Sequence, residues 1–436
     1  MPRVLIYTSP ARGHLYPMMD VAVALREAGH HVTVQTLAAE RERVEGEGLQ
    51  HRPIAPAIEA TTLEDYRASS PLKQVQAAFR CWLARAPHEV DDLRAASAEI
   101  APDLLIIDAN TWGAAAFAEA QGRPWAMFLP YALPVPSPDT PAFGPGFAPP
   151  RHALHRLRDR AVWRAMLGAV RGSTRGLNQL RAELGVPPLR RHFELFDRAD
   201  LLLYRTAEPF EYRRSNWPAN LHAIGPGLWA PPGEAPAWLH ELPRPRVLVS
   251  VSTELQDDGA IVATALEALA DEPGSVIVTT SALDPSTFQP PHDRVRITRF
   301  LPHAAVIPEV DAVVTHGGMG TVQRALAAGV PVCVVPWGRD QSESARRAEH
   351  CGAGVMVPKA KLTPERLRAA VRDARSRKPA AERVAEAFRA AGGAQRAVRL
   401  LEGLVSDRGV DPHRPARTDG HASAHGVRNL VHDVVE

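Results

Sequence analysis

Apolar and polar residues alternate along the first part of the chain in the way that an α/β unit requires. Residues 3–8 form a short apolar run, a polar loop follows, apolar residues then recur at helical spacing from about Pro17 to Ala28, and a second run covers 31–36. Pro17 suits a first helical position because its missing N–H has no partner there, and Gly29 suits the position just past a helix end. The pattern predicts strand, helix and strand in succession.

A further apolar run, 102–110, has almost no polar interruption, which is typical of a parallel strand covered on both faces. The segment 114–124 has the pattern of the next helix, so we expect Asp108 to lie at the carboxyl end of a buried strand. Residues 130–150 are so rich in proline and glycine that they predict a loop. The arginine-rich helical pattern from there to about residue 195 predicts an irregular surface region.

The second half of the chain repeats the α/β alternation. A second proline-rich piece, 225–236, separates the strand-like run 200–206 from a new strand that begins at Arg246. Helical segments lie between the strands that follow. The expected strands are 246–252, 275–280, 294–298, 311–315 and 332–335.

Length and pattern together predict two doubly wound α/β domains, because a domain commonly holds about 100 to 200 residues and the chain has 436. We expect an N-terminal domain at 1–225, a linker at 226–245 and a C-terminal domain at 246–405. The tail at 406–436 has little apolar periodicity, and we expect it to be disordered.

Composition excludes several classes of function. The formal net charge is +2, from 51 basic and 49 acidic residues, so electrostatics gives no reason to propose nucleic acid or an anionic membrane as a partner. Three cysteines are too few for a disulfide framework or a cysteine-rich zinc site. No run approaches the roughly 20 apolar residues of a membrane span. We therefore expect a soluble, cytoplasmic protein that acts on small molecules.

The strongest local signal lies where an expected strand ends at His316 and glycines follow at 317, 318 and 320. Such glycines let a ligand approach the backbone, and the first-turn N–H groups of the next helix form an anion site, so we expect a phosphate or diphosphate there. A tight turn that uses glycine for geometry alone is the alternative. Walker and Gly-x-Gly-x-x-Gly patterns are both missing from the relevant loops, which disfavours ATP and nicotinamide chemistry.

A family resemblance rests on these and neighbouring motifs. "FLPH", "HGGMGT" and "ALAAGVPVCVVPWGRDQ" resemble the nucleotide-sugar signature of family 1 glycosyltransferases. "GHLYP" near the N-terminus resembles their catalytic-histidine loop, and "GGAQRAVRLLEGL" resembles their closing helix. "LPVPSPDTPAFGPG" resembles the acceptor side of actinobacterial members that decorate polyketides and other secondary metabolites. The resemblance covers 3 to about 405 and implies the α/β GT-B fold, with two Rossmann-like domains facing a central cleft.

The resemblance also implies roles on the donor side. Phe300 takes the place of an aromatic residue that stacks on the donor's base. His316 takes the place of the histidine that binds the diphosphate. Asp340 and Gln341 take the place of the pair that binds the sugar hydroxyls. The donor is then a UDP-sugar or a dTDP-sugar, with a hexose favoured by the Asp-Gln pair. The further donor-binding positions are Ser252, Thr253, Leu301, His303, Gly318, Met319, Gly320 and Thr321.

Two positions depart from the family pattern. His303 stands where glutamine is common, and Arg324 stands where a glutamate typically holds the ribose hydroxyls. Because an arginine cannot accept a hydrogen bond, the ribose contact must be rearranged or absent, which a deoxyribose would tolerate better.

The resemblance makes His14 the general base. A neutral imidazole takes a proton from an attacking hydroxyl near pH 7, and a position just before a helix N-terminus favours the neutral form. Asp108 is the candidate partner that would hold the tautomer and stabilise the imidazolium. The alternatives are a surface or capping role for His14 and a cap of the next helix, near Asn110, for Asp108.

Four aromatic residues lie near these positions and are candidates for the acceptor pocket, although core packing would explain them equally well: Tyr16, Trp112, Tyr131 and Phe143. The implied reaction is direct displacement with inversion, without metal or cofactor, in keeping with a sequence that has no Asp-x-Asp. A degenerate nucleotide-sugar-binding or accessory protein and a GT-B epimerase or hydrolase remain open as alternatives.

Overall fold

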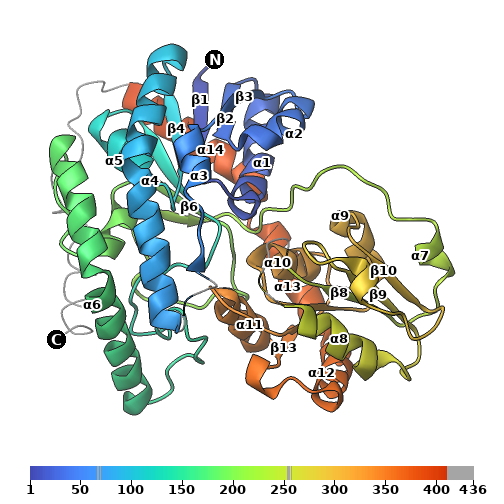
Figure 1. Cartoon of the computed structure of the whole chain (residues 1–436). Coiled ribbons are helices and arrows are strands. Elements are labelled where there is room, and N and C mark those ends of the chain that lie inside the picture. Colours follow the sequence, from blue (N-terminus) through green and yellow to red (C-terminus); the bar gives the residue numbers. More distant parts are fainter. Residues whose placement is uncertain (66–67, 69, 253–255, 257, 410–436) are drawn as a thin grey trace.

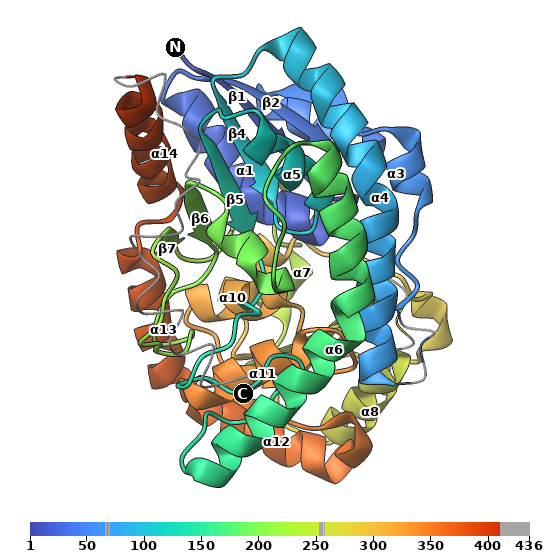
Figure 2. The same ribbon diagram turned by 90° about the vertical axis from the view of Figure 1, so that its left-hand side faces the viewer.

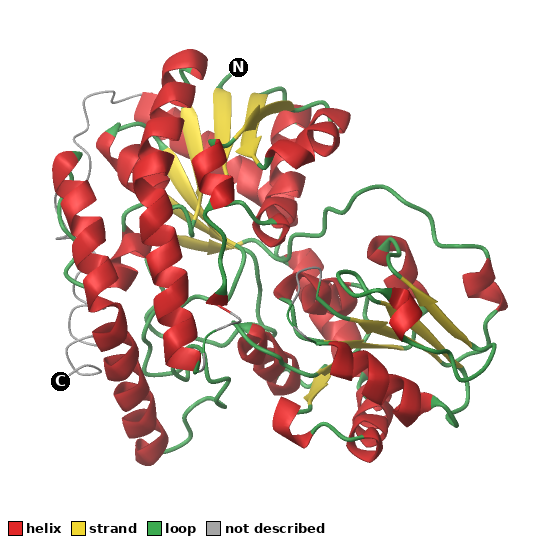
Figure 3. Ribbon diagram, viewed as in Figure 1, coloured by secondary structure: helices red, strands yellow, loops and turns green. Residues whose placement is uncertain are grey.

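The computed structural model describes residues 1–65, 68, 70–252, 256 and 258–409. Within that part of the chain, the strands form two wholly parallel sheets of seven and six strands, each with helices on both faces. We call the units around them the first lobe and the second lobe (Figures 1 and 3). The α/β GT-B-like architecture expected from the sequence is confirmed.

The first lobe is built on a sheet with strand order β3-β2-β1-β4-β5-β6-β7. Its strands are β1 (Arg3–Tyr7), β2 (His31–Thr36), β3 (Gln50–Pro53), β4 (Leu104–Asp108), β5 (Trp125–Leu129), β6 (Leu201–Tyr204) and β7 (Leu221–Ala223). Its helices are α1 (Arg12–Glu27), α2 (Arg41–Gly46), α3 (Pro56–Ala60), α4 (Pro71–Ile100), α5 (Trp112–Ala120) and α6 (Ala153–Glu183). Alternate strand residues feed two cores: Leu5 and Tyr7 pack with α4 and α5, and Val4 and Ile6 pack with α1.

The second lobe has strand order β10-β9-β8-β11-β12-β13. Its strands are β8 (Arg246–Ser250), β9 (Ser275–Thr279), β10 (Val295–Thr298), β11 (Ala312–Thr315), β12 (Val332–Val334) and β13 (Gly354–Met356). Its helices are α8 (Gly259–Leu269), α9 (His303–Val306), α10 (Met319–Ala327), α11 (Gln341–His350), α12 (Pro364–Ser376) and α13 (Lys378–Ala390). The segment between the lobes carries the short helix α7 (Trp238–Glu241).

The last described helix, α14 (Gly393–Gly409), returns to the first lobe. Ala397, Val398 and Leu401 of this helix are buried in the same core as α1, and Figure 2 shows α14 beside the first sheet. From the sequence we expect this segment in the second domain, at 246–405; the structure instead packs it on the first lobe. The tail beyond 409 lies outside the described residues.

Each end of the expected strands lies within two residues of the corresponding end in the structure. Two predictions about helices are wrong. α1 begins at Arg12, so Pro17 lies inside the helix and His14 belongs to its first turn. The expected irregular region up to residue 195 contains α6, a helix of 31 residues. α6 packs beside α4. Its buried apolar positions Trp163, Val170 and Leu177 recur every seven residues, so they lie on one narrow stripe of the helix.

In the described residues, no helix combines the length and the apolar character that a membrane crossing requires.

Candidate active site

Both clusters of expected site residues lie at the points where the strand order reverses. In the first sheet the chain leaves β1 toward β2 on one side and later enters β4 on the other. In open α/β sheets, ligands bind at the carboxyl ends of the strands at such a reversal, because the loops after the two central strands diverge there. His14 follows β1 and Asp108 ends β4. Ser252 and His316 hold the equivalent places after β8 and β11.

His14 and Asp108 contact each other directly. Nδ1 of His14 lies 2.9 Å from Oδ1 of Asp108, whose side chain is fully buried, while 18% of the His14 side chain is exposed. An ionised carboxylate only accepts hydrogen bonds, so Nδ1 carries the proton and Nε2 carries the lone pair. This is the tautomer that a general base of this kind requires.

Asp108 is held in its ionised form by its surroundings. Its Oδ2 accepts the backbone N–H of Ser9 at 2.9 Å, and its Oδ1 accepts that of Asn110 at 3.2 Å. Burial raises the pKa of the Asp108 carboxyl, but the charge of His14 and the hydrogen bonds from His14 and Ser9 outweigh it, and the net pKa lies below the ordinary value. The N-cap of α5 is Thr111, so Asp108 turns the chain before the helix and does not cap it.

The donor-side turn has the geometry of an anion site. Gly317 has φ of +101°, and a Cβ there would lie 2.8 Å from Cγ1 of Val334. Gly318 is the N-cap of α10, and a Cβ on it would meet Nε2 of His316 at 2.9 Å. Burial lowers the pKa of His316 to about 4, so the ring is neutral at pH 7 and offers one N–H as a donor. The first-turn N–H groups of α10 add to this donor set.

Asp340 immediately precedes α11, and Gln341 is the first residue of this helix. Gln341 accepts the backbone N–H groups of Trp337 at 2.7 Å and Gly338 at 3.0 Å and donates to Gln256 at 2.7 Å. Burial raises the pKa of Asp340, whereas the charges of Arg339 and His14 lower it. Arg339, the residue before Asp340, pairs with Asp65 of the first lobe at 3.1 Å, so the start of α11 lies against the lobe that carries His14.

The remaining donor-side residues vary in exposure. The Phe300 side chain is 66% exposed, an accessible aromatic face after β10, whereas Leu301 is buried. Nε2 of His303 lies 3.1 Å from Oγ1 of Thr279, and burial lowers the pKa of His303 to about 4. Thr253 lies outside the described residues. The other expected donor-binding residues lie in the loop after β8 or at the start of α10, next to the turn at 316–318: Ser252, Met319, Gly320 and Thr321.

The four acceptor candidates separate into different surroundings. The Tyr131 ring lies 5.8 Å from the His14 ring, next to the base. Tyr16 faces away toward Glu40 and the linker residue Trp229. Trp112 is 2% exposed and packs against Phe79 and Trp82 in the first lobe's core. Phe143 packs against the apolar core of the second lobe.

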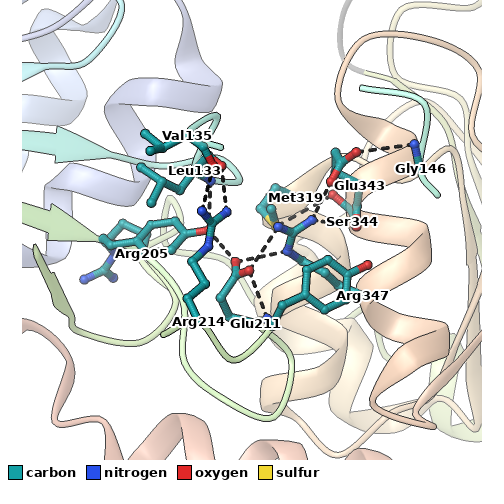
Figure 4. Close-up of polar contacts among 12 residues, drawn as sticks. Leu133, Val135, Gly146, Arg205, Glu211, Arg214, Met319, Glu343, Ser344 and Arg347 are labelled. Carbon is teal, nitrogen blue, oxygen red and sulfur yellow. Dashed lines mark hydrogen bonds and ion pairs between the residues drawn. The ribbon is translucent and has the colours of Figure 1, made fainter. Parts of the chain in front are cut away.

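Sequence reasoning missed a buried ionic cluster that joins the lobes (Figure 4). Arg347 of α11 donates through Nε and Nη2 to the two carboxylate oxygens of Glu211, both at 3.0 Å, and through Nη1 to Glu343 at 2.7 Å. Glu343 in turn accepts the N–H of Gly144 at 2.8 Å. We call Arg347, Glu211 and Glu343 the interlobe clamp. It ties the helix that begins at Gln341 to the proline-rich loop of the first lobe.

Arg324 has a structural role that the sequence did not reveal. Its Nη1 donates to the carbonyl of Leu228 at 2.8 Å and its Nη2 to that of Trp229 at 2.9 Å. Both acceptors lie in the segment that connects the lobes. Arg324 therefore fastens the linker to α10.

Comparison with known proteins gives one consistent result. Residues 263–403 match the family model described as erythromycin biosynthesis protein CIII-like, C-terminal domain. The chain is 34% identical over 421 residues to 4'-demethylrebeccamycin synthase of Lentzea aerocolonigenes, covering 92% of this chain and 99% of that one.

Solved structures agree in fold. The glycotransferase of kitacinnamycin aligns with a TM-score of 0.72 at 23% identity, over 93% of this chain and 100% of that one. The glycosyltransferase VinC in complex with DTDP aligns with a TM-score of 0.68 at 25% identity, over the same shares. The chain is thus a glycosyltransferase: it belongs to family 1 of the GT-B fold, among the relatives of actinomycete natural-product glycosyltransferases.

Proposed function

We propose that this glycosyltransferase moves a hexose from a nucleoside diphosphate sugar to a hydroxyl of a small hydrophobic acceptor, with inversion at the anomeric carbon. The observation that carries the proposal is the His14–Asp108 pair, with its Nδ1 to Oδ1 distance of 2.9 Å. The start of α11, which carries the proposed sugar-binding carboxylate Asp340, lies against the same lobe, because Arg339 pairs with Asp65 there.

In the proposed reaction, Nε2 of His14 takes the proton of the acceptor hydroxyl as its oxygen attacks the anomeric carbon. The bond from that carbon to the diphosphate oxygen breaks, and the nucleoside diphosphate leaves with the electron pair. Asp108 stabilises the imidazolium that forms, because its ionised carboxylate faces Nδ1. Such a positioned base contributes roughly a hundredfold or more to the rate.

The leaving diphosphate is assigned to the turn at His316. The first-turn N–H groups of α10, the N–H of His316 and the hydroxyl of Thr321 are donors suited to its charge. The proposal assigns no metal ion to this step. Asp340 and Gln341 would bind the hexose hydroxyls, and Phe300 would stack on the base.

Relatives support the class of donor and acceptor. VinC was crystallised with DTDP, and Arg324 in place of a ribose-binding glutamate also favours thymidine diphosphate over uridine diphosphate. The erythromycin-biosynthesis family model and the rebeccamycin-forming relative support a polyketide or another secondary metabolite as acceptor.

The test is incubation with dTDP-glucose and UDP-glucose and a panel of phenolic and macrolide acceptors, with diphosphate release and product configuration as readouts. We expect release that depends on acceptor and a β-linked product from the α-configured donor. Release without acceptor would indicate a hydrolase, and donor binding without turnover would indicate a degenerate protein.

Two alanine variants separate the roles of the histidines. His14→Ala should lower the rate of transfer at least about a hundredfold, because the base for the acceptor hydroxyl is lost. The affinity for dTDP, measured by calorimetry, should be unchanged, because the proposal gives His14 no contact with the nucleotide. His316→Ala should weaken dTDP binding about tenfold or more, because a hydrogen bond to a charged group is lost. Transfer at the original rate by His14→Ala would remove His14 from the role of base.

A further inference from the structure

Asn110 contacts the reactive nitrogen of the base candidate, and neither the family resemblance nor the comparisons give it a role. It lies in the turn between β4 and α5 and is 8% exposed. Its Nδ2 is 3.3 Å from Nε2 of His14. Its backbone N–H donates to Asp108, so the same residue touches both members of the pair.

The lone pair on His14 Nε2 and the Tyr131 hydroxyl together fix which end of the Asn110 amide faces the imidazole. The Tyr131 hydroxyl donates to Oδ1 of Asn110 at 2.8 Å. Burial, followed by the charges of Asp108 and Asp340, raises the pKa of Tyr131 well above its ordinary value, so the phenol keeps its proton and remains a donor. With Oδ1 taken, the amide presents Nδ2–H to His14. Nε2 carries a lone pair there, because Nδ1 donates to Asp108.

We propose that Asn110, oriented by Tyr131, is a positioning residue that occupies and aims the lone pair of His14 Nε2 until the acceptor hydroxyl replaces it. The proposal rests on the proposed role of His14 as base. A donor on the lone pair stabilises the neutral imidazole, which is the form that can take a proton. The contact from Asn110 also fixes the plane of the imidazole ring, because Asn110 then holds Nε2 while Asp108 holds Nδ1.

The titratable groups that the described residues place around His14 come from several elements. Asp108 contacts it from β4, and the Tyr131 ring lies 5.8 Å away in the loop after β5. Asp340 acts on it from the start of α11, and Arg12, paired with Glu40, lies on its own helix. All of them stay in place when Asn110 is changed. A shift in the pH profile then reports on Asn110 itself.

The experiment is the pH profile of kcat/KM for the acceptor in wild type, Asn110→Asp, Asn110→Ala and Tyr131→Phe. Asn110→Asp keeps the shape but places a carboxylate beside Nε2, so the acidic limb should move to higher pH by at least about one unit. Asn110→Ala and Tyr131→Phe should move it in the same direction by less, with the KM of the donor unchanged.

A matched control and a reference variant keep the outcomes distinct. Asn178→Asp makes the same chemical change in α6, where the amide joins the backbone of Leu189, and should leave the acidic limb in place. If Asn110 is merely structural, Asn110→Ala and Tyr131→Phe lose rate or stability while the limb stays at the wild-type pH, which overturns this inference alone. If His14→Ala still transfers sugar, the proposed function fails as well.

Discussion

Arg324 shows how a residue that departs from a family pattern can serve the scaffold. The sequence marked it as a departure from the family, and its position in the chain gave no partner. The structure supplies the partners, two backbone carbonyls of the linker at 2.8 and 2.9 Å. A glutamate at this position could not donate to them. The residue is therefore explained as part of the attachment between α10 and the linker.

Replacing Arg324 tests the link between this attachment and the choice of nucleotide. Arg324→Glu should raise the ratio of kcat/KM for the UDP-sugar to that for the dTDP-sugar about tenfold, because a carboxylate can accept from the ribose 2′-hydroxyl. Arg324→Gln, which removes the charge but offers only a neutral acceptor, is the control and should shift the ratio less. An unchanged ratio in steady-state kinetics would separate Arg324 from nucleotide choice.

At the scale of elements, the approach of α5 to α4 places the turn that carries Asp108 and Asn110. Gly113, in the first turn of α5, donates its N–H to Glu89 of α4 at 2.8 Å. A Cβ on Gly113 would lie 1.8 Å from the carbonyl oxygen of Ala86. The two helices can therefore be this close only because residue 113 has no side chain.

A pair of identical substitutions tests this contact. Gly113→Ala should destabilise the protein by about 3 kcal/mol or more, because backbone must move away from backbone. Gly168→Ala lies on the exposed side of α6 with no atom near its Cβ and should stabilise by roughly 0.5–1 kcal/mol, as alanine favours the helix. Urea unfolding measures both. Equal effects of the same sign would contradict the close-approach argument.

The sequence predicted elements best where the apolar run alone determines them. β2 at His31–Thr36 was predicted to the residue, and the ends of β4 and β11 were close enough to place Asp108 and His316 at strand ends. α4 was missed because it is mostly polar and buries a single stripe of residues. The helical pattern of α6 was visible, but with its many arginines it predicted an irregular surface region instead of one long helix. The strand β7 has three residues, too few for a periodic signal.

The candidate site was predictable only in part, because some of its residues that meet in space lie far apart in the sequence. His14, Asp108 and His316 each carry a local signal, a strand end or a motif. The clamp does not: Glu211 and Arg347 are 136 residues apart, and an isolated charged residue in a loop or a helix is ordinary. Asn110 was visible in the sequence, but its contact with His14 depends on folding β1 beside β4.

At the scale of the whole molecule, the interlobe clamp sets how the lobes are joined. Arg347 and Glu211 are each about 2% exposed, and the guanidinium also lies over the Tyr212 ring at 4.4 Å. Charges buried this deeply are stable only as a group, because the loss of one partner leaves the others unpaired away from water. The clamp therefore resists any change that separates the lobes at this point.

Removal of Arg347 should reveal this dependence. Arg347→Ala should cost about 3–5 kcal/mol, because it leaves the carboxylates of Glu211 and Glu343 without their cation, and the two lobes should then unfold in separate steps. Adding Glu211→Gln to that variant should recover part of the loss. The exposed pair of Arg372 and Glu272 within the second lobe provides the control, and Arg372→Ala should leave the urea midpoint unchanged. A single transition at the wild-type midpoint in Arg347→Ala would contradict the argument.

The return of α14 to the first lobe bears on the construction of hybrid enzymes. The chain passes between the lobes twice, so exchanging donor specificity by splicing at the linker alone would bring in a foreign α14. That helix would have to fit the surface of α1 and the contact of His30 with Glu402 at 3.0 Å. A second splice at Gly392 and Gly393, both with positive φ, would keep the native α14 packed on the first lobe. Transplants of the second lobe should therefore be made with two junctions.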